Sequence, residues 1–327
     1  MTESTIQVPG KPEVIENRLY INGEFVPSQS GATFDLYNPA TEAHSASVYE
    51  AGPEDVDRAV AAAKAAFPGW SELGALQRAH YLEKWADNLE KRTAELSSAW
   101  PRSRISRPVD LELGGKSPLV IWDDADLSKA VPAAARSILG NSGQRGDFIE
   151  MLATTMKEMG GGGDPLDPKT TRGPQADAVQ FERVRGYLQL AQEEGVKVYL
   201  GGGREGSTGY FVQPTILADV PESSRLVQEE TFGPVVVVNT FEEEEDMMRR
   251  ANDTEYGLYA SVYTRDISRA LRAAKRFEAG SVCVNCTSPT MAFDMPFGGW
   301  KGSGQGRELG RYATEHWTEV KSVFIAL

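Results

Sequence analysis

The alternation of short apolar runs with helix-period segments after residue 111 most constrains the fold of this chain. SPLVIW (117–122) is a continuous apolar run, typical of a strand buried on both faces. Further strand-like runs follow at 197–200, 214–220, 234–240, 259–264 and 280–286, and helical periodicity is present at 123–139, 148–159, 178–195, 241–250 and 265–277. This order predicts an α/β domain with a mostly parallel sheet.

Residues 1–99 have a different pattern of predicted secondary structure. LYINGEFV (19–26) predicts a hairpin around Asn22-Gly23, and apolar spacing predicts helices at 53–67 and 76–96. The next stretch, WPRSRISRP (100–108), has three arginines, two prolines and no periodicity, so 100–110 is predicted to be an irregular junction. Residues 111–327 then form the second domain, and TEVKSVFIAL (318–327) is predicted to be an exposed final strand.

Charge and hydropathy exclude several classes of partner. The formal net charge is −13, which disfavours binding to nucleic acid or to an anionic membrane. No apolar run reaches the length of a membrane span, and MTESTIQVPG has no apolar signal core. We therefore expect a cytoplasmic protein.

The cysteines and histidines predict no metal site. Cys283 and Cys286 form a single C-x-x-C, which is half of a zinc site, and His44, His80 and His316 are far apart in the sequence. Two reduced thiols on a buried strand are the simpler interpretation.

The sequence offers no evident phosphate-binding loop but does offer one candidate base. GSGQGR (302–307) lacks the third glycine of the dinucleotide motif, and no apolar strand precedes it. Glu112 stands between two leucines just before two glycines, a setting that suits a general base. A salt-bridged or solvent-facing glutamate at a strand end is the alternative.

Several segments together resemble the aldehyde dehydrogenase superfamily, over residues 17–99 and 111–327. They are LELGGKSPLVIWDDADL (111–127), QEETFGPVVVV (228–238) and the stretch 281–310, together with INGEFV, YNPATE and GGGDPLDPKTTRGPQ. The resemblance implies NAD(P)-dependent oxidation of an aldehyde to a carboxylic acid. It also implies an aldehyde-dehydrogenase-like catalytic domain at 111–327, and a remnant of the cofactor domain at 1–99.

The resemblance assigns roles to individual residues. Glu112 matches the general base that activates water, and Glu230 matches the glutamate that holds the nicotinamide-side ribose of NAD or NADP. Phe232 matches the family residue that neighbours this glutamate at the nicotinamide ring. Phe293 and Phe297 lie in the stretch that lines the substrate tunnel in the family.

Two departures from the family pattern concern the chemistry itself. The family's nucleophilic cysteine ends an Asn-x-Gly-Gln-x-Cys motif, whereas here Asn141 to Arg145 is followed by Gly146, which has no side chain. Between Trp100 and Leu111 the chain lacks most of the family's cofactor domain. The cofactor domain is thus predicted to be largely deleted, and much of the NAD or NADP site with it.

Three hypotheses follow. The chain is a truncated family member that is inactive or strongly impaired as a dehydrogenase. Alternatively, it is a repurposed cofactor-free isomerase or hydrolase acting on an aldehyde-like small molecule, with Glu112 as base and Cys286, or less favourably Cys283, as nucleophile. In the third hypothesis it is a non-catalytic partner that associates, through residues 318–327, with itself or with a full-length relative.

Overall fold

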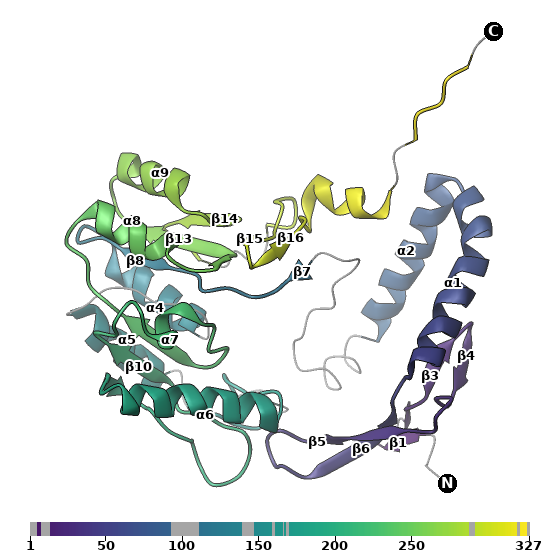
Figure 1. Ribbon diagram of the computed structural model, residues 1–327, viewed down its shortest axis with the longest axis horizontal. Helices are drawn as coiled ribbons and strands as arrows, with labels where there is room; N and C mark the ends of the chain where they lie inside the picture. Colours follow the sequence, from purple (N-terminus) through teal and green to yellow (C-terminus); the bar gives the residue numbers. More distant parts are fainter. Residues whose placement is uncertain are drawn as a thin grey trace. The chain divides into compact units, whose positions relative to one another are not determined.

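A computed structural model describes residues 5–7, 14–92, 111–138, 147–158, 161–165, 167, 170–287, 292–318 and 321–325. The chain forms two compact units, an N-terminal unit, Met1–Arg104, and a C-terminal unit, Ile105–Leu327 (Figure 1). The predicted junction at 100–110 and the loop that contains Gly146 lie outside the described residues. The predicted domain limits therefore stay a prediction.

The N-terminal unit consists of three hairpins and two helices. The hairpins pair β1 (Thr5–Gln7) with β2 (Val14–Glu16), β3 (Leu19–Ile21) with β4 (Glu24–Val26), and β5 (Thr33–Tyr37) with β6 (His44–Tyr49). Asn22 and Gly23, with φ of 55° and 83°, make the two-residue turn between β3 and β4. Both residues adopt the left-handed region that a tight hairpin turn requires, so the predicted hairpin is confirmed.

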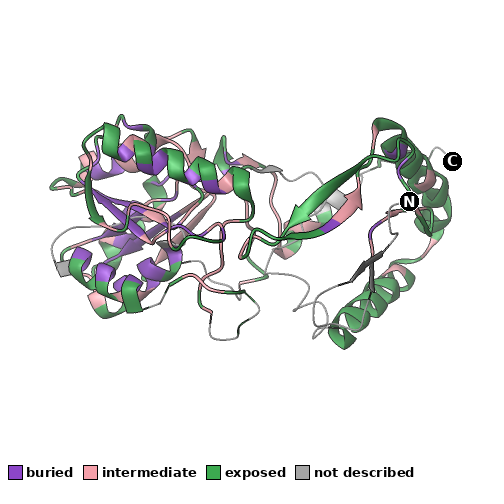
Figure 2. Ribbon diagram, turned by 90° about the horizontal axis from the view of Figure 1, so that it is seen from below, coloured by how far each residue is buried: buried purple, intermediate pink, exposed green. Residues whose placement is uncertain are grey.

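Helices α1 (Pro53–Glu72) and α2 (Ala75–Lys91) form where the apolar spacing predicts them, but they bury very little. On the apolar stripe of α1, Val56 is 53% exposed and Phe67 is 63% exposed, and no side chain of α2 is buried. Figure 2 shows both helices exposed over most of their length. Local periodicity thus produces the helices, whereas burial contributes little to their stability.

The strands of the C-terminal unit run mostly parallel. β13 (Tyr259–Tyr263) pairs in parallel with β8 (Leu119–Ile121) on one side and with β14 (Ser281–Val284) on the other. β10 (Thr215–Ala218) pairs in parallel with β11 (Val235–Val238) and antiparallel with β9 (Lys197–Leu200). The predicted α/β fold with a mostly parallel sheet is confirmed.

Helices cover these strands and supply the core. They are α4 (Leu127–Ile138), α5 (Asp147–Glu158), α6 (Ala178–Glu193), α7 (Arg225–Gln228), α8 (Glu244–Asn252) and α9 (Ile267–Arg276). One cluster joins both groups of strands, since Ile121 of β8 and Ile216 of β10 are buried with Leu152 of α5. No helix in the described part of the chain is long and apolar enough to cross a bilayer.

Short strand pairs and one 3₁₀ helix complete the C-terminal unit. β7 (Leu111–Glu112) pairs with β16 (Gly304–Gln305), β12 (Tyr256–Gly257) pairs with β15 (Trp300–Lys301), and a 3₁₀ helix, η1, spans Gly310–Trp317. Contrary to the prediction, residues 321–325 form no strand. A strand needs a neighbour for its backbone N–H and C=O groups, and the described residues offer none there.

Asp55 provides a test of what stabilises the N-terminal unit. Its buried carboxylate accepts hydrogen bonds from the backbone N–H groups of Gly52 and Gln29, each at 3.1 Å, and lies 3.3 Å from Arg58. Asp55→Ala leaves those donors unpaired and removes the helix cap. We expect it to lower the free energy of unfolding of this unit by about 1–2 kcal/mol.

Hydrogen exchange of peptides from residues 27–60 measures this loss. Asp57→Ala is the matched control, because Asp57 lies exposed on the same helix. Equal exchange in the two variants would show that the Asp55 contacts do not stabilise the unit.

Candidate functional site

The segment that carries Glu112 lies beside the glycine-rich stretch 302–307. In the β7–β16 pair Glu112 is opposite Gly304, and the backbone N–H of Leu113 donates to the carbonyl of Ser303 at 2.9 Å. Phe297 and Glu308 form the next bridge, with the N–H of Phe297 donating at 2.8 Å. The backbone thus brings together two segments that are about 190 residues apart, which residue spacing alone does not reveal.

Gly114 brings the Glu230 carboxylate against this same segment. Gly114 has φ of +81°, and a Cβ at this position would overlap the side-chain oxygens of Glu230. Only glycine both adopts this backbone conformation without strain and leaves room for the carboxylate. The first and second segments of the family resemblance are therefore in direct contact.

A cleft of about 410 Å³ opens next to this contact. Its wall includes Glu230 and Phe232, with Lys116, Arg172, Gln175 and Gln180. Phe232 is 68% exposed, with φ of 52°, and its carbonyl accepts a hydrogen bond from Gln180 Nε2 at 3.0 Å. Both residues predicted to contact a cofactor thus line one cleft, and their role stays a prediction.

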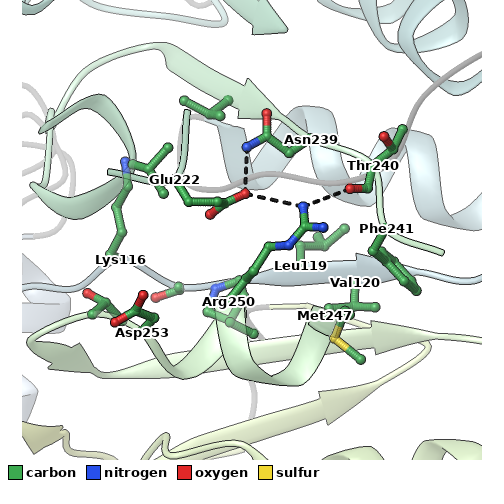
Figure 3. Close-up of a pocket in the computed structure, with 16 residues that line it drawn as sticks. Lys116, Leu119, Val120, Glu222, Asn239, Thr240, Phe241, Met247, Arg250 and Asp253 are labelled. Carbon is green, nitrogen blue, oxygen red and sulfur yellow. Dashed lines mark hydrogen bonds and ion pairs between the residues drawn. The ribbon is translucent and has the colours of Figure 1, made fainter. Parts of the chain in front are cut away.

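Lys116 is a site residue that the sequence reasoning missed. It is half-buried, and its Nζ donates a hydrogen bond to the carbonyl of Leu226 at 2.8 Å. Burial lowers the pKa of the Lys116 ammonium to about 8, and the negative charge of Glu230 opposes that shift. The sequence signal for this residue was its position: Lys116 follows two glycines and precedes an apolar strand. Lys116 also borders a second cavity, of about 150 Å³ (Figure 3).

The two cysteines lie together at the end of β14. Cys283 is opposite Ser261 in the sheet, and its thiol contacts Cys286 and Tyr259. Burial raises the pKa of the Cys283 thiol to about 11, whereas Cys286 is exposed. Both are free thiols, and in the described ranges no three His, Cys, Asp or Glu side chains gather where they could hold a metal.

Phe293 and Phe297 lie on the loop that leads to η1. Phe293 is 61% exposed and its carbonyl accepts from the N–H of Gly310 at 3.0 Å, while Phe297 is half-buried. Neither residue borders the two cavities described above. Their assignment to a substrate tunnel stays a prediction.

Comparison with known proteins identifies the family. The family model described as "Aldehyde dehydrogenase family" matches residues 25–103 and 102–323. The chain belongs to the aldehyde dehydrogenase family. It is 41% identical over 233 residues to an aldehyde dehydrogenase of Agaricus bisporus, covering 67% of this chain and 46% of that protein. It is 38% identical over 278 residues to retinaldehyde dehydrogenase 3 of Mus musculus, covering 81% of this chain and 50% of that protein.

A solved aldehyde dehydrogenase has a closely similar fold. The NAD+ complex of the Bacillus cereus enzyme superposes with a TM-score of 0.88 at 27% identity, over 98% of this chain and 99% of that chain. By sequence, however, this chain spans about half the length of the curated relatives it matches. The family match itself comes in two pieces that meet at residues 102–103.

The contact between Gly114 and Glu230 predicts a specific loss of stability in this aldehyde dehydrogenase relative. Gly114→Ala introduces a Cβ at positive φ and into the Glu230 carboxylate. Gly195→Ala is the control, since Gly195 has φ of +65° and no atom within 4 Å of the added Cβ. We expect Gly195→Ala to lower the free energy of unfolding by about 1 kcal/mol, and Gly114→Ala to lower it by about 1–3 kcal/mol more than that.

Urea unfolding followed by tryptophan fluorescence measures both variants. Adding Glu230→Ala to Gly114→Ala should recover most of the excess, as a double-mutant cycle reveals. A cycle with no coupling between the two positions would show that the carboxylate does not occupy this place.

Proposed function

We propose that this chain is an aldehyde dehydrogenase relative that is inactive or strongly impaired in NAD(P)-dependent aldehyde oxidation. The observation that carries the proposal is Gly146, which stands where the family motif has its nucleophilic cysteine. Without a thiol, the carbonyl carbon has no protein atom to bond to at this position, and no thiohemiacetal forms there. Removing the nucleophile of a covalent enzyme lowers the rate by on the order of 10⁶ in a well-studied protease.

The cofactor site supports the same conclusion. Glu230 and Phe232 on the 410 Å³ cleft fit the nicotinamide–ribose end of a dinucleotide, since they offer a hydrogen-bond acceptor and an exposed ring. The pyrophosphate half has no counterpart in the described residues, where no strand leads through a glycine-rich turn into a helix. The residues present therefore fit one end of NAD or NADP and not the whole molecule.

The cofactor-free alternative receives less support. It requires Cys286 and Glu112 to act on one substrate. In the described contacts Cys286 touches Cys283 at the end of β14, whereas the Glu112 strand pairs with Gly304. Nothing described joins the two, so we place this hypothesis second.

The variant Gly146→Cys distinguishes the effect of the missing nucleophile from that of the incomplete cofactor site. The natural chain, assayed with NAD+ or NADP+ and propanal, should produce no reduced cofactor above a protein-free control. Gly146→Cys should remain inactive in this assay, because the dinucleotide site is incomplete. It should nevertheless release nitrophenol from an activated ester at least tenfold faster than the natural chain, since ester cleavage needs a thiol but no hydride acceptor.

Gly146→Ser is the matched control and should not gain that ester cleavage to the same extent. Reduced cofactor formed by the natural chain would overturn the proposal. Ester cleavage by the natural chain that disappears in Glu112→Gln would favour the cofactor-free hypothesis instead.

One further observation favours association as a second candidate function. Val323, Phe324 and Ile325 are 72%, 95% and 79% exposed, and they belong to no strand among the described residues. Exposed apolar residues with unpaired backbone groups favour addition to the sheet edge of another chain. A second copy of this chain or a full-length relative would supply that edge.

Proline substitution tests strand addition. Val323→Pro removes a backbone N–H and keeps a side chain of similar size, whereas Val323→Ala removes more apolar surface and keeps the N–H. We expect the natural chain and the alanine variant to elute as a larger species in size-exclusion chromatography with light scattering, and the proline variant to shift toward the monomer. A monomeric natural chain that captures no tagged full-length relative would contradict this candidate.

A further inference from the structure

The 150 Å³ cavity beside Lys116 is bounded by apolar side chains on one side and by a polar network on the other (Figure 3). Leu119 and Val120 of β8, Val237 of β11, and Phe241 and Met247 at α8 form the apolar wall. A cavity of this volume accommodates a molecule of about six non-hydrogen atoms, since an engineered apolar cavity of about 150 Å³ in another protein binds benzene. The cavity therefore selects small, mainly apolar ligands.

The polar groups opposite this wall are paired with one another. Asn239 Nδ2 donates to Glu222 Oε1 at 2.8 Å, and Arg250 Nη1 donates to the Thr240 carbonyl at 2.9 Å and lies 3.4 Å from Glu222. Arg250 also pairs with Asp246. These bonds satisfy the network internally, and Lys116 is the lysine that lines the cavity.

The environment of Lys116 raises the fraction of neutral, nucleophilic amine. Its Nζ donates to the Leu226 carbonyl, and within the described residues it forms no ion pair. The charged groups that face it are Glu230 from the 410 Å³ cleft, and Glu222, Asp253 and Arg250 around the cavity. Burial outweighs the attraction of Glu230 and lowers the pKa of Lys116 to about 8. A lysine with this property is the usual source of Schiff-base chemistry.

We propose that Lys116 reversibly binds small apolar aldehydes in this cavity as a Schiff base. The lone pair of Nζ adds to the carbonyl carbon, and the resulting carbinolamine loses the carbonyl oxygen as water together with both amine protons. The product is an imine, and no oxidant or reductant takes part. Because the site uses neither Gly146 nor a dinucleotide, it does not depend on whether the chain oxidises aldehydes.

Reductive trapping on the full chain tests this site. The protein is incubated with butanal and cyanoborohydride at pH 7.5, and the butylated lysines are identified by peptide mass spectrometry. Lys116 should be modified at least about tenfold faster than the exposed Lys129 and Lys197, since a pKa of about 8 leaves far more neutral amine than the usual value of about 10.4. Modification no faster than at those two lysines would overturn the proposal.

Two variants distinguish binding of the aldehyde in the cavity from simple reactivity of the Lys116 amine. Lys116→Arg keeps a cation and a donor for Leu226, and it should abolish trapping at this position while leaving Lys129 unchanged. Ala251→Leu narrows the cavity and should slow trapping of butanal at Lys116 at least fivefold, but not that of formaldehyde. Equal slowing of both aldehydes, or of neither, in a variant with unchanged circular dichroism would show that the cavity does not bind the aldehyde.

Discussion

The C-terminal unit depends on one central strand. β13 is hydrogen-bonded on both sides, with Ser261 opposite Leu119 of β8 and opposite Cys283 of β14. Because all three strands are parallel, their carboxyl ends meet at one edge, where Asp124 accepts from Thr264 Oγ1 at 2.8 Å and Asn285 bonds the Thr264 backbone. The turn after β14 then brings Cys286 back to Cys283. The positions of Lys116, before β8, and of both thiols, at the end of β14, follow from this pairing.

The two units differ in what holds them. In the C-terminal unit, side chains from strands of both sheets and from α4 and α5 are fully buried together, which provides the apolar burial that stabilises a domain. The N-terminal unit has helices with a clear apolar stripe and almost nothing packed on it, and Asp55 is the buried side chain of α1. Its order rests more on turns and caps. The stripe therefore leaves apolar surface of this unit exposed.

The fold of this family member and its catalytic chemistry depend on very different numbers of residues. The family match and the superposition report the scaffold, whose strands and core are determined by many residues at once. Catalysis depends on single atoms, and the proposed loss of activity rests on one residue, Gly146, at the position of the motif's cysteine. The Schiff-base chemistry proposed for Lys116 needs no other catalytic group.

The sequence by itself determined the features that depend on neighbouring residues. Alternation of apolar runs and helical periods predicted β8, β10, β11, β13 and β14 and the helices α4, α5, α6, α8 and α9, but not the short α7, and Asn22-Gly23 predicted the hairpin. Gly146 at the motif's cysteine position is the basis of the prediction that the nucleophile is missing. Only the tertiary structure decided that Glu230 lies against Gly114, that half-burial lowers the pKa of Lys116, and that residues 321–325 find no strand partner among the described residues. Periodicity and turn chemistry act over a few residues, whereas burial and electrostatics sum contributions from distant segments. Lys116 and Leu226, whose carbonyl accepts the Lys116 hydrogen bond, are 110 residues apart in the sequence. No local sequence pattern predicts this hydrogen bond.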